Sequence, residues 1–261
     1  MLSRISAVSA LASFTLAVGA LAACERAETK NSTSPVTTTS PAGTSTAPSA
    51  AVADLRDEAL VRAVNAIPAG APVDIYAGDL TVFDNLTYKS VTAYRALDGK
   101  RYTFAVRPAG MAQAKPLSSN TEGLDDGEYY TVFAMPGEGN AAHLRVVQDM
   151  LAPPGAGKAR LRVIHGGAEA GEIDLYATGT PVALFDGVDF QSVTDYEDID
   201  PLNGEMEIRA QGQAAPLVKV PLVHIEAGKF YTLVIVGRVR STPKLEAFLI
   251  EDALTSGTTR K

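Results

Sequence analysis

Cysteine is nearly absent from this chain of 261 residues, and its single copy is Cys24. One thiol cannot form an intramolecular disulfide framework, nor a zinc site that needs several cysteines. The position of Cys24 near the N-terminus, rather than chemistry within a folded domain, must therefore explain it.

Positive charge is also in deficit. Lysine and arginine number 23 against 30 aspartates and glutamates, so the formal net charge is −7, and the sequence pI is about 5.0. A phosphate backbone would be repelled on average, and no long basic run offsets that repulsion. We therefore expect no nucleic-acid partner.

Familiar catalytic motifs are missing as well. The sequence contains no Gly-x-Ser-x-Gly, no His-Glu-x-x-His and no phosphate-binding Gly-rich loop with its lysine. The three histidines, His143, His165 and His224, lie far apart and lack the spacing of a helical metal-binding pair. The usual hydrolase and nucleotide-binding hypotheses lose their support, and no cofactor is expected.

The N-terminus has the layout of a bacterial secretory signal. Arg4 precedes an uncharged, mostly apolar stretch over residues 5–23. The run Leu21-Ala22-Ala23-Cys24 resembles the bacterial lipobox, in which the signal is cleaved before a cysteine that carries a diacylglycerol. The alternative is an uncleaved membrane helix, which is marginal at this length for a bilayer core of about 30 Å. We expect residues 1–24 to be a lipoprotein signal peptide with Cys24 lipidated.

These features predict a location in the cell envelope. Glu25 follows the cysteine, whereas an aspartate there commonly resembles an inner-membrane retention signal in Gram-negative lipoproteins. We expect a membrane-anchored, palmitate-bearing protein, with the outer membrane favoured if the source is Gram-negative. Residues 25–56 should form a disordered tether, because nineteen of the twenty residues at 32–51 are Ser, Thr, Pro, Ala or Gly.

Beyond this tether the chain repeats itself. The run Val73-Asp74-Ile75-Tyr76 matches Ile173-Asp174-Leu175-Tyr176 at an offset of 100 residues. Ser90-Val91-Thr92-Ala93-Tyr94 matches Ser192-Val193-Thr194-Asp195-Tyr196 at an offset of 102. The matching blocks keep their order, so we expect two copies of one module, separated by a short linker rich in proline and glycine.

Each copy has the pattern of an all-β module. Its strongest segments are brief, β-branched and aromatic, such as Tyr129-Tyr130-Thr131-Val132-Phe133, and Gly or Pro interrupts them about every ten residues. The run Val73-Asp74-Ile75-Tyr76 alternates, which predicts a half-buried strand. We expect two tandem antiparallel β-sandwiches, immunoglobulin-like or transthyretin-like, over residues 57–152 and 159–253.

Four blocks recur in order: an arginine-containing first strand, a Val/Ile-Asp-hydrophobe-Tyr strand, a Ser-Val-Thr-x-Tyr block, and a late strand such as Gly228-Lys229-Phe230-Tyr231-Thr232. This order resembles the domain-of-unknown-function 4397 family. Members are exported bacterial proteins with one or more such domains, so the resemblance implies export and an immunoglobulin-like or transthyretin-like sandwich. It implies no activity.

His165 is the most conspicuous single residue, because an imidazole at a strand end can serve as a base or a ligand. Many members of the family carry His-Ala-Ser-Pro after the first strand, where this chain has Asn65-Ala66-Ile67-Pro68 and His165-Gly166-Gly167-Ala168. Asn65 shares the hydrogen-bonding ability of His165 but not its basicity. A structural role in a turn is therefore the preferred interpretation.

Two arginine–aspartate combinations recur at matching places. Arg62 and Asp74 fall on the first two expected strands of the first copy, and Arg162 and Asp174 on those of the second. Adjacent strands could bring each combination together as a partly buried ion pair. Two copies of a fold-specifying contact are more plausible than two copies of a catalytic dyad, so we predict structural pairs and assign no catalytic residue.

The second copy contains an acidic loop whose carboxylates are weak candidates for a metal site: Asp195, Glu197, Asp198 and Asp200. Clustered oxygen ligands could bind Ca²⁺, and Asp186 and Asp189 lie nearby in sequence. The first copy has Ala93-Tyr94-Arg95-Ala96-Leu97-Asp98 in this place, so the feature is not intrinsic to the fold. A solvated acidic face is the preferred interpretation, with no metal assigned and a calcium-dependent scaffold as the alternative.

Two classes of function follow from these observations. We favour a non-catalytic envelope lipoprotein whose modules act as a binding or spacer element for another envelope protein, glycan or peptide. The alternative is an enzyme with an unrecognised site at the domain junction. A β-sandwich can support either, so the fold alone does not choose between them.

Overall fold

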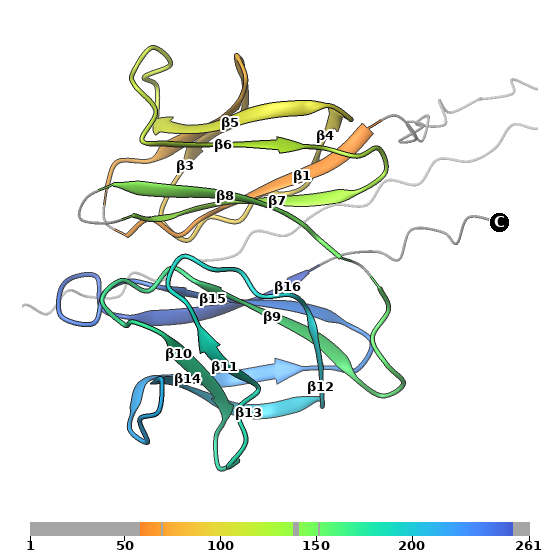
Figure 1. Ribbon diagram of the computed structural model, residues 1–261, viewed down its shortest axis with the longest axis vertical. Coiled ribbons are helices and arrows are strands. Elements are labelled where there is room, and N and C mark those ends of the chain that lie inside the picture. Colours follow the sequence, from red (N-terminus) through yellow and green to blue (C-terminus); the bar gives the residue numbers. More distant parts are fainter. Residues whose placement is uncertain (1–57, 69, 138–140, 151, 253–261) are drawn as a thin grey trace, which may run out of the picture. The chain divides into compact units, whose positions relative to one another are not determined.

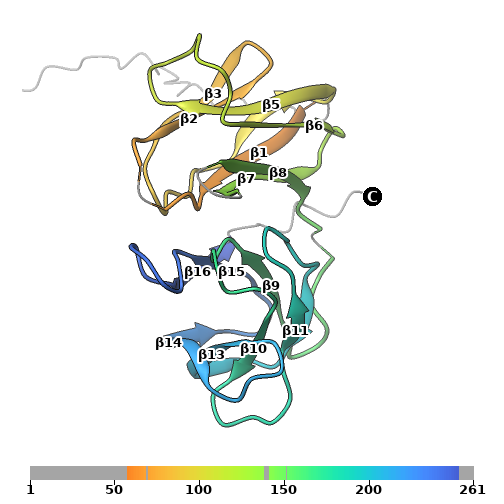
Figure 2. The same ribbon diagram turned by 60° about the vertical axis from the view of Figure 1, so that its left-hand side comes forward.

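The computed structural model describes residues 58–68, 70–137, 141–150 and 152–252, and all sixteen regular elements in these ranges are β-strands. Figures 1 and 2 show the strands β1–β8 of the first repeat and β9–β16 of the second. Among the described elements there is no helix able to cross a membrane. The predicted signal peptide, Cys24 and the predicted tether lie outside the described residues.

The first repeat folds into two four-stranded sheets, with the orders β4-β1-β7-β8 and β3-β2-β5-β6. Its strands are β1 Glu58–Asn65, β2 Val73–Ala77, β3 Leu80–Leu86, β4 Arg95–Asp98, β5 Arg101–Pro108, β6 Ser118–Gly123, β7 Tyr129–Pro136 and β8 Ala142–Gln148.

The second repeat has the same arrangement, with the sheet orders β12-β9-β15-β16 and β11-β10-β13-β14. Its strands are β9 Ala159–His165, β10 Ile173–Ala177, β11 Phe185–Val188, β12 Glu197–Ile199, β13 Leu202–Ala210, β14 Pro216–Ile225, β15 Phe230–Val236 and β16 Glu246–Asp252. The prediction of two tandem all-β sandwiches is confirmed.

Each sandwich contains one parallel pair of strands. β1 lies parallel to β7, with Leu60 opposite Tyr129, and β9 lies parallel to β15, with Arg160 opposite Phe230. The other pairs of named strands are antiparallel. Parallel neighbours need a long crossover connection. Here the connection from β1 to β7 runs through the second sheet of the same sandwich.

Each sandwich closes over an apolar core drawn from its own repeat. The first core includes Val61, Ile75, Phe104 and Val132. The residues at the corresponding positions of the second core are Leu161, Leu175, Met206 and Leu233. Because the two cores occupy matching positions, the sequence repeat is a repeat of packing as well as of strand order.

Strand β2 differs from the half-buried strand that its alternation predicts, since all five residues of Val73–Ala77 are buried. Asp74 is only 5% exposed, and it accepts hydrogen bonds from the backbone N–H groups of Asn85 on β3 and of Gly110 in the turn after β5. Tyr76 lies beneath the guanidinium of Arg107, which is 5.2 Å from its ring centroid. Polar partners thus allow both faces of this strand to be buried.

A further apolar cluster is shared by the two repeats. It consists of Val64, Ala66, Phe133 and Met135 from the first and Ile164, Val234 and Val236 from the second. On β1, Val61 and Ala63 face the core of their own sandwich, whereas Val64 faces this shared cluster. Strands β7 and β15 are therefore buried on both faces, which explains their nearly continuous apolar sequences.

Candidate functional site

Four buried charges meet where the two repeats pack together. Nη2 of Arg62, on β1, lies 2.5 Å from a carboxylate oxygen of Asp252 at the end of β16. Nη2 of Arg162, on β9, lies 2.7 Å from a carboxylate oxygen of Asp149, which follows β8. The four side chains are at most 4% exposed. Each repeat supplies the arginine of one pair and the aspartate of the other.

Hydroxyl groups complete each half of this arrangement. Thr131 accepts a hydrogen bond from Nε of Arg62 at 3.0 Å and donates one to Asp149 at 2.8 Å. The Tyr94 hydroxyl also donates to Asp149, at 2.8 Å. The second repeat reproduces these contacts at 2.7–2.9 Å with Arg162, Thr232, Tyr196 and Asp252. We call these eight residues the junction network.

The charged groups of the junction network stabilise one another's protonation states. Burial alone would lower the pKa of Arg62, but the nearby Asp252, Tyr94 and Asp149 raise it above its ordinary value. Burial and the Asp149 carboxylate raise the pKa of Tyr94. The guanidinium and phenol groups therefore stay protonated at neutral pH and serve as hydrogen-bond donors. Each arginine is thus held by a carboxylate and a threonine hydroxyl, and each tyrosine by a carboxylate, which is the arrangement expected of a structural contact.

The predicted pairing of Arg62 with Asp74, and of Arg162 with Asp174, is wrong. Asp74 receives backbone N–H groups, and Asp174 likewise accepts hydrogen bonds from the N–H groups of Gly187 at 2.9 Å and Gly212 at 3.2 Å. Each aspartate thus connects a neighbouring edge strand, β3 or β11, to a turn of its own sandwich. The arginine side chains lie on the face of their strand that is turned toward the other repeat, and each pairs with an aspartate of that repeat. This pairing is needed because a buried charge is stable only beside its counter-charge.

The sequence does show that the actual partners, Asp149 and Asp252, occupy matching positions, although it does not show which arginine each one pairs with. Val147-Gln148-Asp149 lies at the end of β8, with Asp149 just after the strand, and Ile250-Glu251-Asp252 ends β16, at an offset of 103 residues. Extending the comparison of the copies to their C-terminal ends reveals this matched aspartate.

His165 is held by the turn that follows β9. Its Nε2 donates to the carbonyl oxygen of Gly171 at 2.8 Å, and its Nδ1 accepts the N–H of Gly167 at 3.3 Å. Burial lowers the pKa of the imidazole, which favours its neutral form. Asn65 likewise accepts the N–H two residues on, that of Ile67 at 3.0 Å, but it donates to a different carbonyl, that of Leu86 on β3 at 3.0 Å. The geometry is that of a structural turn.

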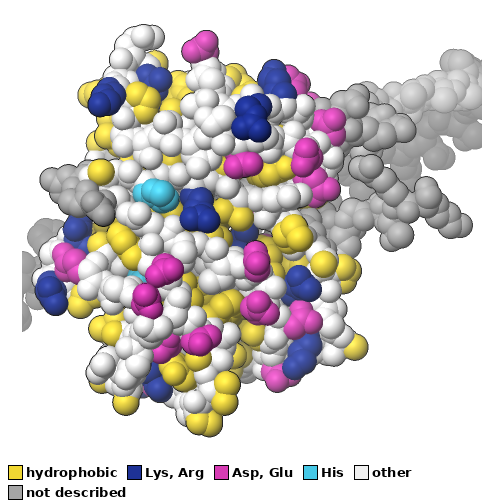
Figure 3. Space-filling view, in the orientation of Figure 1, with side chains coloured by type: hydrophobic (Ala, Val, Ile, Leu, Met, Phe, Trp, Pro, Cys, Tyr) yellow, Lys and Arg dark blue, Asp and Glu magenta, His cyan; other side chains and the backbone are white. Residues whose placement is uncertain are grey.

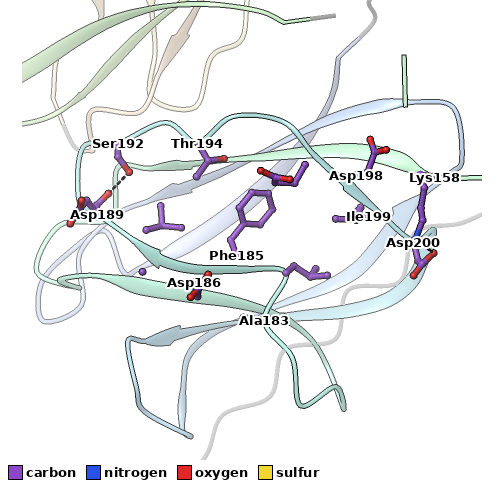
Figure 4. Close-up of a pocket in the computed structure, with 14 residues that line it drawn as sticks. Lys158, Ala183, Phe185, Asp186, Asp189, Ser192, Thr194, Asp198, Ile199 and Asp200 are labelled. Atoms are coloured by element: carbon purple, nitrogen blue, oxygen red, sulfur yellow. Dashed lines mark hydrogen bonds and ion pairs between the residues drawn. The ribbon is translucent and has the colours of Figure 1, made fainter. Parts of the chain in front are cut away.

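An open cleft of about 570 Å³ lies in the second repeat, between β11 and β12, which are edge strands of its two sheets. The buried side chains of Phe185, Val188 and Ile199 contribute to its lining. Its charged lining residues are Lys158, Asp186, Asp189, Glu197, Asp198 and Asp200. Figure 4 shows aspartates on both sides of the cleft with Phe185 between them, and Figure 3 shows acidic side chains over this part of the surface.

Three of the four candidate calcium ligands line this cleft, and Asp195 does not. Asp198 lies 3.1 Å from Nε of Arg160, and Asp200 lies 2.7 Å from Nζ of Lys158. No group of three or more His, Cys, Asp or Glu residues is placed to hold a metal ion in the described part of the chain. The acidic loop is thus a charged wall of the cleft, partly neutralised by neighbouring cations.

The first repeat has a much smaller cavity at the equivalent place, about 130 Å³. The residues that line it are Phe83, Asp84, Leu86, Thr92, Ala93 and Arg95. One fold therefore carries an open acidic cleft in its second copy and a nearly filled one in its first.

Strand order, duplicate cores and the junction network define a tandem β-sandwich protein. The family described as Domain of unknown function (DUF4397) matches the chain twice, over residues 59–176 and 168–260, and the chain belongs to this family. The predicted resemblance is confirmed. No curated protein sequence matches the chain.

Two solved structures show distant likeness. The C-terminal domain of AlgF from P. aeruginosa is 19% identical, with a TM-score of 0.30, and the match covers 37% of this chain and 99% of that one. The crystal structure of a "putative cell adhesion protein" from Bacteroides fragilis NCTC 9343 is 9% identical, with a TM-score of 0.18 and coverage of 77% and 100%. At these scores, the description of the fold rests on the strand pairing of the chain itself.

Proposed function

We propose that this chain is a non-catalytic, lipid-anchored envelope protein that binds another envelope protein through the cleft of its second repeat. The first repeat and the N-terminal segment act as the spacer that holds the cleft away from the bilayer. Cys24 at its lipobox supports the anchor, and the composition of residues 25–56 supports the tether.

The observation that carries the proposal is the difference between the two copies. They share strand order, core positions and the junction network, yet the cleft measures about 570 Å³ in one and about 130 Å³ in the other. A pure spacer would gain nothing from this difference, whereas concave sites with a few polar groups over an apolar floor are typical of ligand recognition.

The junction network supports the non-catalytic part of the proposal. Its arginines and aspartates are fully paired and buried, and its hydroxyls donate to carboxylates that are already neutralised. A nucleophile or general base needs a free, reachable lone pair, which paired carboxylates at most 4% exposed do not offer.

A blocked cleft tests the proposal. Ala183 lines the cleft, and the corresponding residue of the first repeat is Thr81. Full-length wild type, Ala183→Trp and Thr81→Trp would be expressed with the lipid anchor intact, cross-linked in the envelope and purified in detergent. We expect a specific envelope protein to be captured by wild type and Thr81→Trp but lost with Ala183→Trp. Capture that is equal in all three would contradict binding through the cleft.

A further inference from the structure

In the first repeat, the side chain of Arg95 occupies the position that corresponds to the open cleft of the second repeat. It lies on β4 opposite Val61, and its guanidinium carbon is 5.4 Å from the ring centroid of Phe83 on β3. Its Nη1 donates to the carbonyl oxygen of Val82 at 2.7 Å. This side chain therefore bridges the edge strands of the two sheets, and it leaves the small cavity described above.

In the second repeat, the same register position is held by a glutamate. Glu197 on β12 lies opposite Leu161, as Arg95 lies opposite Val61. Phe185 on β11 lies opposite Leu175, as Phe83 lies opposite Ile75. The aromatic platform is thus retained, while the cation that covers it in the first repeat is replaced by an anion.

Only some of the carboxylates that line the cleft pair with basic side chains of the chain itself. Asp198 and Asp200 pair with Arg160 and Lys158, as described above. Among the ion pairs of the described residues, none involves Asp186, Asp189 or Glu197. An aromatic floor beside three such carboxylates favours a cation that is flat, weakly hydrated and able to donate several hydrogen bonds.

We propose that the cleft of the second repeat binds the guanidinium of an arginine carried by a segment of the partner protein. This inference rests on the proposed function and names the chemistry of its ligand. The arginine takes the place that Arg95 takes in the first repeat, with its plane over Phe185 and its N–H groups toward Glu197 and Asp186. A guanidinium suits this site better than an ammonium, because it stacks on an aromatic ring and pairs with carboxylates through two parallel N–H groups.

Labelled peptides test this ligand directly. The full chain in non-ionic detergent would be titrated into fluorescein-labelled, amidated tetra-arginine, tetra-lysine and tetra-citrulline, and the anisotropy measured. We expect tetra-arginine to bind about three- to tenfold more tightly than tetra-lysine, and tetra-citrulline to show no saturable binding. Higher salt should weaken the binding, because the attraction is between exposed charges.

Variants distinguish binding in the cleft from general attraction to the net negative charge of the protein. Glu197→Arg recreates the arrangement of the first repeat and should weaken tetra-arginine binding at least tenfold, while Glu128→Arg, an exposed residue of the first repeat, should change it less than twofold. Glu197→Gln serves as a milder second variant if Glu197→Arg fails to fold, and it should weaken binding several-fold. Equal losses for the Glu197 and Glu128 variants, or equal affinity for the arginine and lysine peptides, would overturn the inference.

The chain's own C-terminal segment provides one more check, since it contains Arg260 and Lys261. Deleting residues 254–261 should leave the affinity for tetra-arginine unchanged, and a severalfold rise would assign the cleft to that segment instead of a partner.

The two proposals can fail separately. A partner that is lost with Ala183→Trp, without arginine-selective peptide binding, would overturn the ligand class alone. Arginine-selective binding without any such partner would overturn the proposed function alone.

Discussion

The guanidinium of Arg62 and the carboxylate of Asp252 are 190 residues apart in sequence, yet they form one buried ion pair across the two repeats. Asp252→Ala would leave Arg62 buried without its counter-charge. We expect a loss of about 3–5 kcal/mol in the free energy of unfolding, measured by urea denaturation.

Asp74→Ala is the matched comparison, because it removes a buried carboxylate that faces backbone N–H groups and no arginine. It should cost about 1–3 kcal/mol. Replacing both members of the ion pair, as in Arg62→Met with Asp252→Leu, should recover much of the loss. A larger loss for Asp74→Ala than for Asp252→Ala would contradict the pairing described here.

Separated repeats provide a second prediction. Fragments spanning residues 53–152 and 154–253 each retain a complete core, so each should fold with β-type circular dichroism and unfold cooperatively. Each should be less stable than the full chain, because separation exposes the shared apolar cluster and leaves the junction network unpaired. Mixing the fragments should restore stability, as followed by thermal melts and sedimentation. If neither fragment folds alone, the two repeats form a single folding unit.

His165 predicts a specific pH dependence. Burial lowers its pKa in the folded protein, so the unfolded chain binds a proton first as pH falls below about 6.5. The contribution of this neutral histidine is fully present above that pH and declines below it. His165→Asn, which installs the residue of the first repeat, should remove that part of the decline. The difference in unfolding free energy between wild type and variant should therefore change between pH 7.5 and pH 5. A constant difference would contradict a buried neutral imidazole.

Calcium should have little effect on the protein. Two of the carboxylates that line the cleft already pair with Arg160 and Lys158, so chelators should leave the melting temperature nearly unchanged. A rise of several degrees with millimolar Ca²⁺ would instead make the loop from Asp195 to Asp200 a metal site.

Lipid attachment can be tested by metabolic labelling with a clickable fatty acid. We expect label on the wild type and none on Cys24→Ser, because Cys24 is the sole thiol of the chain. Replacing residues 1–24 by an ordinary cleavable signal should release a soluble folded protein. Unlabelled wild type that still sediments with membranes would point to an uncleaved N-terminal helix.

Sequence patterns predicted the two modules and their all-β fold because the determinants are local and doubled. Short β-branched runs define strands, and matching blocks in the same order at offsets of 100–103 residues define the copies. The partner of Arg62 could not be predicted in this way. In a duplicated chain each residue has a twin, so strand order within one copy does not reveal whether an arginine pairs inside that copy or with the other one.

Only part of the cleft could be predicted from the sequence. The contrast between Arg95 and Glu197 is present in the aligned blocks, and it suggests a difference in charge. Whether a gap opens there depends on the separation of two edge strands that belong to different sheets, and no spacing in the sequence encodes that separation.

The two members of each ion pair between the repeats are synthesised at different times. A chain synthesised from its N-terminus produces Arg62 early, but its counter-charge, Asp252, appears 190 residues later, at the end of the last strand. A product that stops short of β16 therefore retains an unmatched arginine on the face that the second repeat should cover. We therefore expect a chain that ends before β16 to be less stable than the complete one and to be cleaved more readily by proteases.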